Sequence, residues 1–215
     1  MFDSILFLHG FATTPRVWKH QQETLSDKYN ILTDPGEAKK TNGSLAIVGW
    51  SQGAQQAINL YLEMRDRVTS LVLVSATPRF LSDDEYPHGL SSALLRNLER
   101  KVKDNLKEGL RFFYGLLFEG AHEHEIFKEM PEFTSEQILA DLEKLKLEDV
   151  RGLLHKIEVP TLLIHGEKDQ ICLPQASYYM ADIIPNVSLK IMSGVGHAPH
   201  VERPDEFSRL LKEFV

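Results

Sequence analysis

Short apolar runs alternate with helix-spaced stretches along this chain. The runs of strand length are 4–8, 29–33, 45–48, 70–75, 159–165 and 187–192. Helical spacing of apolar residues begins at Pro15 and after Ser51, and recurs at 175–184 and 202–215. Runs that are apolar at every position are typical of strands buried on both faces of a parallel sheet. The alternation therefore predicts an α/β fold, a mostly parallel sheet with helices on both faces.

The alternation stops after residue 77. From 78 to 156 the sequence has no strand pattern and is rich in helical spacing and charge. We therefore expect a core formed by 1–77 and 157–215, with a helical cap inserted at 78–156. Apolar residues three and four positions apart predict one long helix over 92–118, and the polar segment 37–43 is expected to be an irregular connection. Inserted caps usually shape access to a binding site.

Composition narrows the class of protein. The 215 residues are enough for one compact domain, and 42% apolar with 26% charged residues is ordinary for a soluble globular protein. Residues 1–7 lack the basic and apolar regions of a signal peptide, and Cys172 has no intrachain partner, so we expect a cytoplasmic protein. We also expect a monomer. The net charge of -7 disfavours general binding to nucleic acid or to anionic membranes.

A candidate nucleophile lies where a predicted strand meets a predicted helix. Residues 49–53 read Gly-Trp-Ser-Gln-Gly, which matches G-x-S-x-G. In this motif the serine sits on a strained turn, and the two glycines let strand and helix approach closely. The helix N-terminus also offers N–H groups to an oxyanion. An ordinary Gly-rich turn would show the same letters, so the strand-to-helix setting carries the prediction that Ser51 is a nucleophile.

A nucleophilic serine needs a base, and the base needs an orienting carboxylate. Asp169 and His197 each follow a predicted strand, in the chain order Ser, Asp, His. Loops at the carboxyl ends of neighbouring parallel strands lie at one edge of the sheet. We therefore predict a triad of Ser51, Asp169 and His197.

Other polar residues are weaker candidates for these roles. The alternatives are His165, His200 and Glu202 near the predicted base, Asp34 as a rival carboxylate, and His9, which we expect to support its loop. A histidine pair at His122 and His124 lacks the H-E-x-x-H spacing and a nearby cysteine, so we interpret it as a solvated acidic loop. No metal or cofactor is predicted.

The oxyanion hole is expected to consist of two backbone N–H groups, those of Phe11 and Gln52. Gly10 lets the backbone turn toward the cleft, and the Phe11 ring is expected to form a wall over the substrate.

A row of basic residues accompanies the apolar face predicted for 92–118. It consists of Arg96, Arg100, Lys103, Lys107 and Arg111. Like charges four positions apart repel, and a plain solvated face would intersperse acids along the row. We therefore favour an anionic partner over a solvent face. In a chain of net charge -7, that partner is expected to be an acidic protein surface and not nucleic acid.

The motifs at 9–11, 49–53, 74–80, 84–87 and 196–199 resemble the α/β-hydrolase family, and most closely the pimeloyl-[acyl-carrier protein] methyl ester esterases of biotin synthesis. The resemblance implies a serine carboxylesterase that cleaves the methyl ester of a pimeloyl chain while acyl carrier protein docks on the cap. It also implies that Lys107 and Arg111 contact the carrier and that Phe112 lines the acyl channel. We expect Phe11, Trp50 and Phe113 to contact the substrate as well.

This chain departs from the family in three places. No strand is predicted before residue 4, so the sheet is expected to be shortened at its N-terminal side. The connection 34–45 is too short for the usual helix, and 119–141 is acidic where the family is more basic.

Three alternative functions stay open. A general short-chain carboxylesterase would use the same triad. A menaquinone-pathway lyase of the same fold shares His-Gly-Phe followed by a Trp, and would need a basic pocket where an esterase would need an apolar channel. A catalytically silent ligand-binding relative would fit the fold but leave Ser51, Asp169 and His197 without a role.

Overall fold

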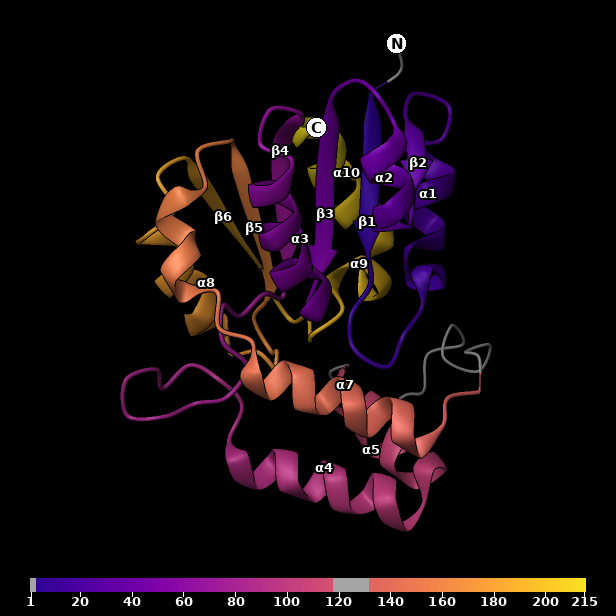
Figure 1. The fold of residues 1–215 in the computed structure, drawn as a ribbon, viewed down its shortest axis with the longest axis vertical. Helices are drawn as coiled ribbons and strands as arrows, with labels where there is room; N and C mark the ends of the chain where they lie inside the picture. Colours follow the sequence, from indigo (N-terminus) through magenta and orange to yellow (C-terminus); the bar gives the residue numbers. More distant parts are fainter. Residues whose placement is uncertain (1–2, 118–131) are drawn as a thin grey trace.

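The computed structural model describes residues 3–117 and 132–215, and these form one parallel sheet with helices around it (Figure 1). The strands are β1 (Ser4–Leu8), β2 (Asn30–Leu32), β3 (Leu45–Trp50), β4 (Val68–Val74), β5 (Thr161–Gly166) and β6 (Val187–Met192). Their order is β2-β1-β3-β4-β5-β6, and each neighbouring pair is parallel. The predicted α/β class is confirmed.

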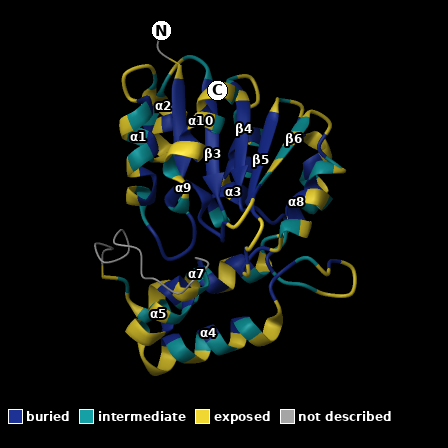
Figure 2. Ribbon diagram, turned by 180° about the vertical axis from the view of Figure 1, so that it is seen from behind, coloured by how far each residue is buried: buried dark blue, intermediate teal, exposed yellow. Residues whose placement is uncertain are grey.

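Helices cover both faces of the sheet. On one face lie η1 (Pro15–Trp18), α1 (Lys19–Leu25), α9 (Pro199–Glu202) and α10 (Pro204–Phe214); on the other lie α2 (Pro35–Lys40), α3 (Gln52–Glu63), η2 (Arg151–Lys156) and α8 (Pro174–Ala181). Every residue of β1, β3 and β5 is buried (Figure 2). Burial on both faces explains why these strands read as unbroken apolar runs.

A short helix, α2, lies where an irregular connection was expected. Asp34 accepts a hydrogen bond from the Glu37 N–H at its Oδ1 (2.9 Å), and Pro35 occupies the first helical turn. Asp as an N-cap followed by Pro is a recognised helix start. Of the six helical residues, Ala38 alone is buried, so the helix carries no apolar periodicity. The expectation of irregular structure was therefore wrong.

Three of the helices described between β4 and β5 lie beyond the carboxyl ends of the strands (Figure 1). They are α4 (Ser92–Asp104), α5 (Leu106–Leu117) and α7 (Ser135–Leu147). At their base the two connecting segments meet: Val150 N–H donates to the Pro78 carbonyl (2.8 Å), and Arg79 bridges to Asp149. We refer to α4, α5 and α7 as the cap.

The single helix predicted for 92–118 is wrong, because the chain breaks at Asn105. This residue is extended (φ -159°, ψ 108°), and its side-chain oxygen accepts from the Glu108 N–H (3.3 Å). Asparagine competes with helical hydrogen bonding in this way and favours caps. The break lets α5 fold back against α4. Gly109 packs so closely on Val102 that a Cβ on Gly109 would stand 2.7 Å from the Val102 side chain. Phe118, where the predicted helix ended, lies outside the described residues.

Candidate active site

Ser51 occupies a turn that holds its backbone in an unusual conformation. It links β3 to α3 with φ 55° and ψ -119°, a combination that residues with a side chain rarely adopt. A Cβ on Gly49 would overlap the Gly53 carbonyl, and a Cβ on Gly53 would overlap the Leu8 carbonyl. Both glycines are therefore required by the close approach of strand and helix. The Ser51 side chain is left half-buried at the carboxyl edge of the sheet.

Asp169 and His197 are brought together by the loops after β5 and β6. His197 Nδ1 donates to Asp169 Oδ2 (2.7 Å), and both side chains are almost fully buried. Asp169 Oδ1 accepts the N–H groups of Ile171 (2.8 Å) and Cys172 (3.0 Å). Burial alone would raise the pKa of Asp169, but the adjacent His197 and hydrogen bonds from two histidines bring that pKa well below its usual range. Asp169 is therefore an ionised carboxylate.

The other ring nitrogen of His197 is left for chemistry. Nε2 is buried and has no hydrogen-bond partner among residues 3–117 and 132–215. The backbone around it is held firmly: the His197 N–H donates to the Leu117 carbonyl (2.7 Å), and Trp50 Nε1 donates to the His197 carbonyl (2.7 Å). An oriented imidazole with a free nitrogen is what a general base requires.

Ser51 lies beside the loop that carries Asp169. Burial and the nearby Asp169 raise the pKa of the Cys172 thiol well above its usual value, and an interaction with the Ser51 side chain opposes this only in part. Cys172 in turn donates its N–H to Asp169. The predicted residues Ser51, Asp169 and His197 thus lie in one neighbourhood at the sheet edge.

The loop after β1 lies against Ser51 from the other side. A Cβ on Gly10 would stand 3.3 Å from Ser51 Cβ, and the residue after Phe11, Ala12, has a positive φ of 52°. Within the described part of the chain, the backbone N–H groups of Phe11 and Gln52 donate to no other residue. His9 supports this loop through the hydrogen bond between its Nδ1 and the Gly10 carbonyl (3.0 Å), and burial lowers the pKa of His9.

Helix α5 of the cap is hydrogen-bonded to both loops, which the sequence did not indicate. The Tyr114 hydroxyl donates to the Ala12 carbonyl (2.7 Å), and the Leu117 carbonyl accepts from His197. Burial raises the pKa of Tyr114 to about 12, so the hydroxyl remains a donor at neutral pH. The cap therefore positions the loop of Phe11 and the loop of His197 together.

We expect Tyr114→Phe to slow ester hydrolysis about 3- to 10-fold, because the loop after β1 loses a buried tether while the ring is kept. Unfolding in urea is expected to show a loss of about 1 kcal/mol. Steady-state kinetics on a short-chain ester measure the first effect, and Tyr29→Phe, which removes a hydroxyl bonded to the Val215 carbonyl far from Ser51, is the matched control. Equal kinetic losses in both variants would contradict the tether.

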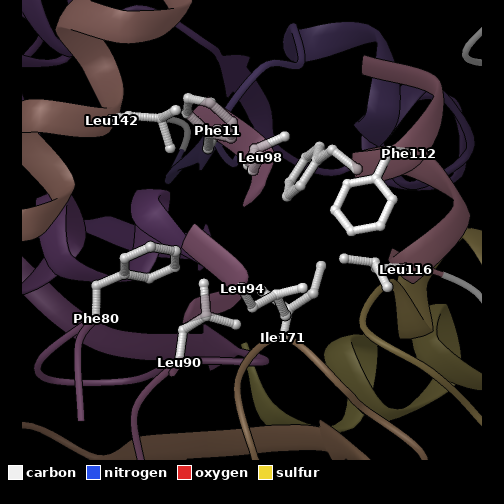
Figure 3. Close-up of a pocket in the computed structure, with 10 residues that line it drawn as sticks. Phe11, Phe80, Leu90, Leu94, Leu98, Phe112, Leu116, Leu142 and Ile171 are labelled. Carbon is white, nitrogen blue, oxygen red and sulfur yellow. The ribbon is translucent and has the colours of Figure 1, made fainter. Parts of the chain in front are cut away.

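An apolar pocket lies between the cap and the core (Figure 3). It is lined by Phe11, Phe80, Leu90, Leu94, Leu98, Phe112, Phe113, Leu116, Leu142 and Ile171. Its free volume is about 10 Å³, room for roughly one water molecule, so side chains must move before an acyl chain can enter. Three of the four expected substrate contacts, Phe11, Phe112 and Phe113, belong to this lining.

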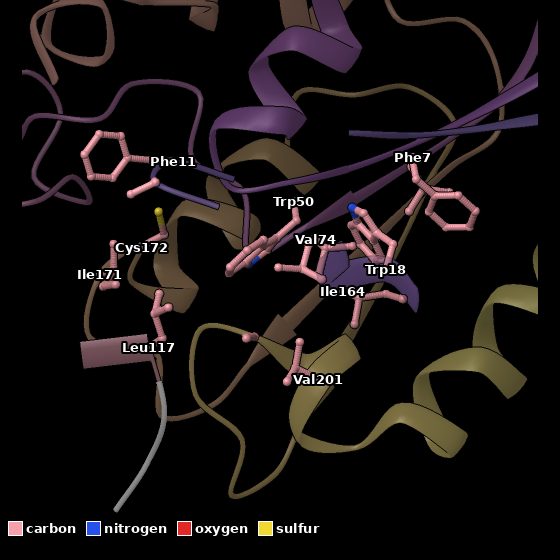
Figure 4. Packing of buried hydrophobic residues seen from close by; sticks show 14 of the residues in the cluster. Phe7, Phe11, Trp18, Trp50, Val74, Leu117, Ile164, Ile171, Cys172 and Val201 are labelled. Atoms are coloured by element: carbon pink, nitrogen blue, oxygen red, sulfur yellow. The ribbon is translucent and has the colours of Figure 1, made fainter. Parts of the chain in front are cut away.

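Trp50, the fourth expected contact, does not line that pocket. Figure 4 shows it among buried core residues that include Trp18 and Val74. Its ring lies 5.5 Å from the His197 ring, and its Nε1 donates to the His197 carbonyl. Trp50 therefore supports the histidine loop from beneath, where it is too deeply buried to meet a substrate.

The weaker candidates occupy structural positions, with one exception. His200 is fully buried against the rings of Trp18 (4.0 Å) and Trp50 (4.7 Å), and burial holds its pKa well below the usual range. Asp34 caps α2, and Glu202 accepts the Gly196 N–H (2.8 Å). The exception is His165, which contacts Asp169 directly.

No group of three metal-ligating side chains occurs among the described residues, and His122 and His124 lie outside them. Over the same residues, no helix combines the length and apolar character needed to cross a membrane.

The basic residues expected to bind a partner are divided between two helices by the break at Asn105. Arg96, Arg100 and Lys103 lie on α4, whereas Lys107 and Arg111 lie on α5. All five are exposed. Arg100 lies 3.7 Å from Asp104 and Arg111 lies 2.5 Å from Glu108, and exposed pairs of this kind exchange easily for other partners.

Comparison with known proteins agrees with the fold. The family model described as serine aminopeptidase, S33, matches residues 8–204. The pimeloyl-[acyl-carrier protein] methyl ester esterase of Nitrosomonas europaea is 28% identical, with 94% of this chain and 92% of that protein aligned. The esterase of the same name from Wigglesworthia glossinidia brevipalpis is 24% identical, with coverage of 99% and 93%.

Among solved structures, an esterase from Exiguobacterium antarcticum superposes with a TM-score of 0.88 at 21% identity, covering 100% of this chain and 91% of the other. A bromoperoxidase from Bacillus anthracis gives 0.87 at 19% identity, covering 100% and 92%. At these identities the superpositions support the fold alone. Because the family model spans nearly the whole chain, this protein belongs to the serine aminopeptidase S33 family of α/β-hydrolases.

Proposed function

We propose that this chain is a serine carboxylesterase that hydrolyses the methyl ester of a pimeloyl chain carried on acyl carrier protein. The observation that carries the proposal is the His197–Asp169 hydrogen bond, which leaves Nε2 without a partner in the described chain. It is accompanied by the strained backbone of Ser51 and by an apolar pocket lined in part by Phe11, whose loop lies against Ser51. Family membership supports ester hydrolysis of the α/β-hydrolase type.

In the proposed mechanism Ser51 attacks the ester carbonyl while His197 Nε2 takes the hydroxyl proton. The ionised Asp169 holds the Nδ1–H tautomer and stabilises the imidazolium that forms. His197 then returns the proton to the departing methanol. A water molecule activated by the same nitrogen hydrolyses the acyl-enzyme and releases the acid.

The N–H groups of Phe11 and Gln52 hold the oxyanion of each tetrahedral intermediate. Both are free of other hydrogen bonds in the described chain, and Gln52 begins α3, where the helix dipole favours negative charge. Each donor of such a pair contributes about 3 kcal/mol to lowering the barrier.

The pocket chemistry favours a methylene chain as the acyl group. Every lining residue is aromatic or aliphatic, so a small polyanion would find no basic partner there. This observation counts against the menaquinone-pathway lyase. Two relatives with coverage above 90% are named as pimeloyl-carrier esterases, which is the reason for choosing that acyl chain over other medium-length ones.

The carrier is proposed to dock on the exposed basic residues of α4 and α5, as the acidic partner expected from the charge pattern. Docking at Lys107 and Arg111 would place the carrier on the helix that also holds Ala12 and His197 through hydrogen bonds. Complementary charge mainly speeds association and is weakened by salt.

A charge reversal tests this docking surface. Lys107→Glu/Arg111→Glu is expected to lower kcat/KM for the carrier-linked methyl ester about 10- to 100-fold at low ionic strength, because attraction becomes repulsion during the encounter. Hydrolysis of a small free methyl ester is expected to stay unchanged. Stopped-time assays of both substrates at low and moderate salt give the comparison.

The matched control is Arg209→Glu/Lys212→Glu on α10, which makes the same charge change on exposed residues of the opposite side. Like Arg111, Arg209 lies near a glutamate of its own helix, Glu213 (3.4 Å). An equal loss in both double variants would mean that overall charge, and not a docking surface on α5, governs the reaction. A wild type that cleaves small esters but not the carrier substrate would retain the esterase mechanism and remove the carrier.

A further inference from the structure

His165 is a second histidine on the carboxylate of Asp169. It is the penultimate residue of β5 and is fully buried. Its Nε2 lies 3.0 Å from Asp169 Oδ2, the oxygen that accepts from His197, and 2.7 Å from the Cys172 carbonyl. Its Nδ1 lies 2.6 Å from the Ser177 hydroxyl of α8. The ring is thus held at both nitrogens.

The partners of His165 determine which nitrogen carries a hydrogen. A carboxylate and a carbonyl only accept, so Nε2 must donate. In the neutral ring Nδ1 then accepts, and Ser177, whose hydroxyl can donate, satisfies it. The arrangement is complete in this tautomer. The opposite tautomer would leave Nε2 facing two acceptors without a hydrogen.

Asp169 consequently has four donor groups around it, two near each oxygen. Oδ1 accepts two backbone N–H groups, and Oδ2 accepts from His197 and lies 3.0 Å from His165 Nε2, whose one hydrogen is shared with the Cys172 carbonyl. A donor on Oδ2 draws negative charge away from the oxygen that faces His197. It therefore weakens the attraction between Asp169 and a protonated His197 while fixing the carboxylate in the plane that His197 needs.

We propose that His165 is a positioning residue that orients Asp169 and limits how strongly Asp169 stabilises the protonated form of His197. This inference rests on the proposed triad and adds to it a control of base strength. A base that is too easily protonated is inactive over more of the pH range, so a donor shared with Asp169 affects the pH range over which the enzyme is active.

The other titratable groups around the pair do not change charge in the relevant range. His200 of α9 stays neutral because burial lowers its pKa, and Cys172 stays a thiol because burial raises its pKa. Ser51 contributes a neutral hydroxyl. The acidic limb of the pH–rate profile is the range in which kcat/KM falls as the pH falls. If this limb shifts when His165 is substituted, the shift therefore reports on the His197–Asp169 pair.

The test compares His165→Met with His165→Gln. Met fills the site without a donor, whereas the Gln side-chain amide can reach the place of Nε2 and donate to Asp169. We expect the acidic limb of kcat/KM for a short-chain p-nitrophenyl ester to move to higher pH by about 0.5 to 1 unit in His165→Met, with kcat about tenfold lower and KM little changed. In His165→Gln the acidic limb is expected to lie at the same pH as in the wild type.

Two further measurements keep the inference testable if His165→Met folds poorly. Ser177→Ala removes the hydroxyl that donates to Nδ1 and holds the His165 ring in place, and it is expected to shift the limb in the same direction by a smaller amount. The downfield proton resonance of the His197 Nδ1–H is expected to move in His165→Met and Ser177→Ala and to return in His165→Gln. This resonance reports on the Asp169 hydrogen bond without any substrate.

The outcomes separate this inference from the proposed function. If Ser51→Ala hydrolyses the ester as fast as the wild type, the triad itself fails. Ser51→Ala can be inactive while His165→Met, His165→Gln and Ser177→Ala all keep the acidic limb and the proton resonance of the wild type. In that case the triad stands and His165 is a packing residue only. Loss of kcat in proportion to the folded fraction, with an unmoved limb, would likewise overturn the positioning role of His165.

Discussion

Ser51→Ala is expected to lower kcat for ester hydrolysis by about 10⁵-fold, the largest effect of any single change considered for this chain. The substitution removes only the hydroxyl oxygen. Alanine keeps the Cβ, so the strained backbone at φ 55° is the same in both proteins, and the backbone hydrogen bonds from Ser51 to Val74 and from Ala54 to Ser51 are kept. Binding and the oxyanion donors remain, which leaves a residual rate about 10³-fold above that in water. The rate of p-nitrophenyl ester hydrolysis measures the effect.

Ser51→Gly provides a control for the backbone. It is expected to be as inactive as Ser51→Ala but more stable by about 1 kcal/mol or more, because glycine adopts a positive φ without strain. Covalent labelling by a serine-directed phosphonate should occur in the wild type and in neither variant. A decrease of less than about 100-fold in Ser51→Ala would place the nucleophile elsewhere or indicate direct attack by water, and absence of phosphonate labelling in the wild type would revive the catalytically silent relative.

The sequence predicted the parts of the fold that depend on local pattern. The apolar run 4–8 coincides with β1, and 45–48 lies within β3, because strands buried on both faces need apolar residues throughout. Helix α2 was missed because Ala38 is its one buried residue and leaves no period to detect. The sequence signal for α2 was the capping pair Asp34 and Pro35, but the same two residues are also common in turns.

The break at Asn105 illustrates a different limit. The apolar spacing of 92–118 continues across it, so periodicity alone predicts one helix. The structure instead pairs α4 with α5, which buries Gly109 against Val102. That choice depends on tertiary packing, although an asparagine in a helical run is a local signal for a cap. The division of the basic row between two helices follows from this break.

At the candidate site, motif spacing predicted Ser51, Asp169 and His197, whereas the residues that support them were identified only from the structure. Tyr114 and His165 lie 102 and 4 positions from the residues that they contact, Ala12 and Asp169. Neither separation forms a motif, because strand order and cap docking create these contacts. By sequence His165 is only a weaker candidate for the base, and the structure places it on the carboxylate, not on the serine.

Asp169→Asn is expected to lower kcat by about 10⁴-fold while leaving KM nearly unchanged. Four donor groups lie around this side chain, three of them hydrogen-bonded to it, and an ionised carboxylate can accept from all of them. An amide NH₂ group must face either the two backbone N–H groups or the two histidines. Facing His197, it would favour the tautomer that carries the hydrogen on Nε2, which cannot take a proton from Ser51. Kinetics on the short-chain ester measure the loss.

The structure supplies a matched control in Asp34→Asn, which makes the same chemical change at a carboxylate that also follows a strand. Asp34 caps α2 with one hydrogen bond, and asparagine caps as well as aspartate, so kcat and stability are expected to stay near wild type. Asp169→Asn is also expected to unfold more easily, by about 1 to 3 kcal/mol, because a buried donor loses its acceptor. If Asp169→Asn kept a wild-type kcat, the convergence of four donors would serve stability alone, and another group would have to orient His197.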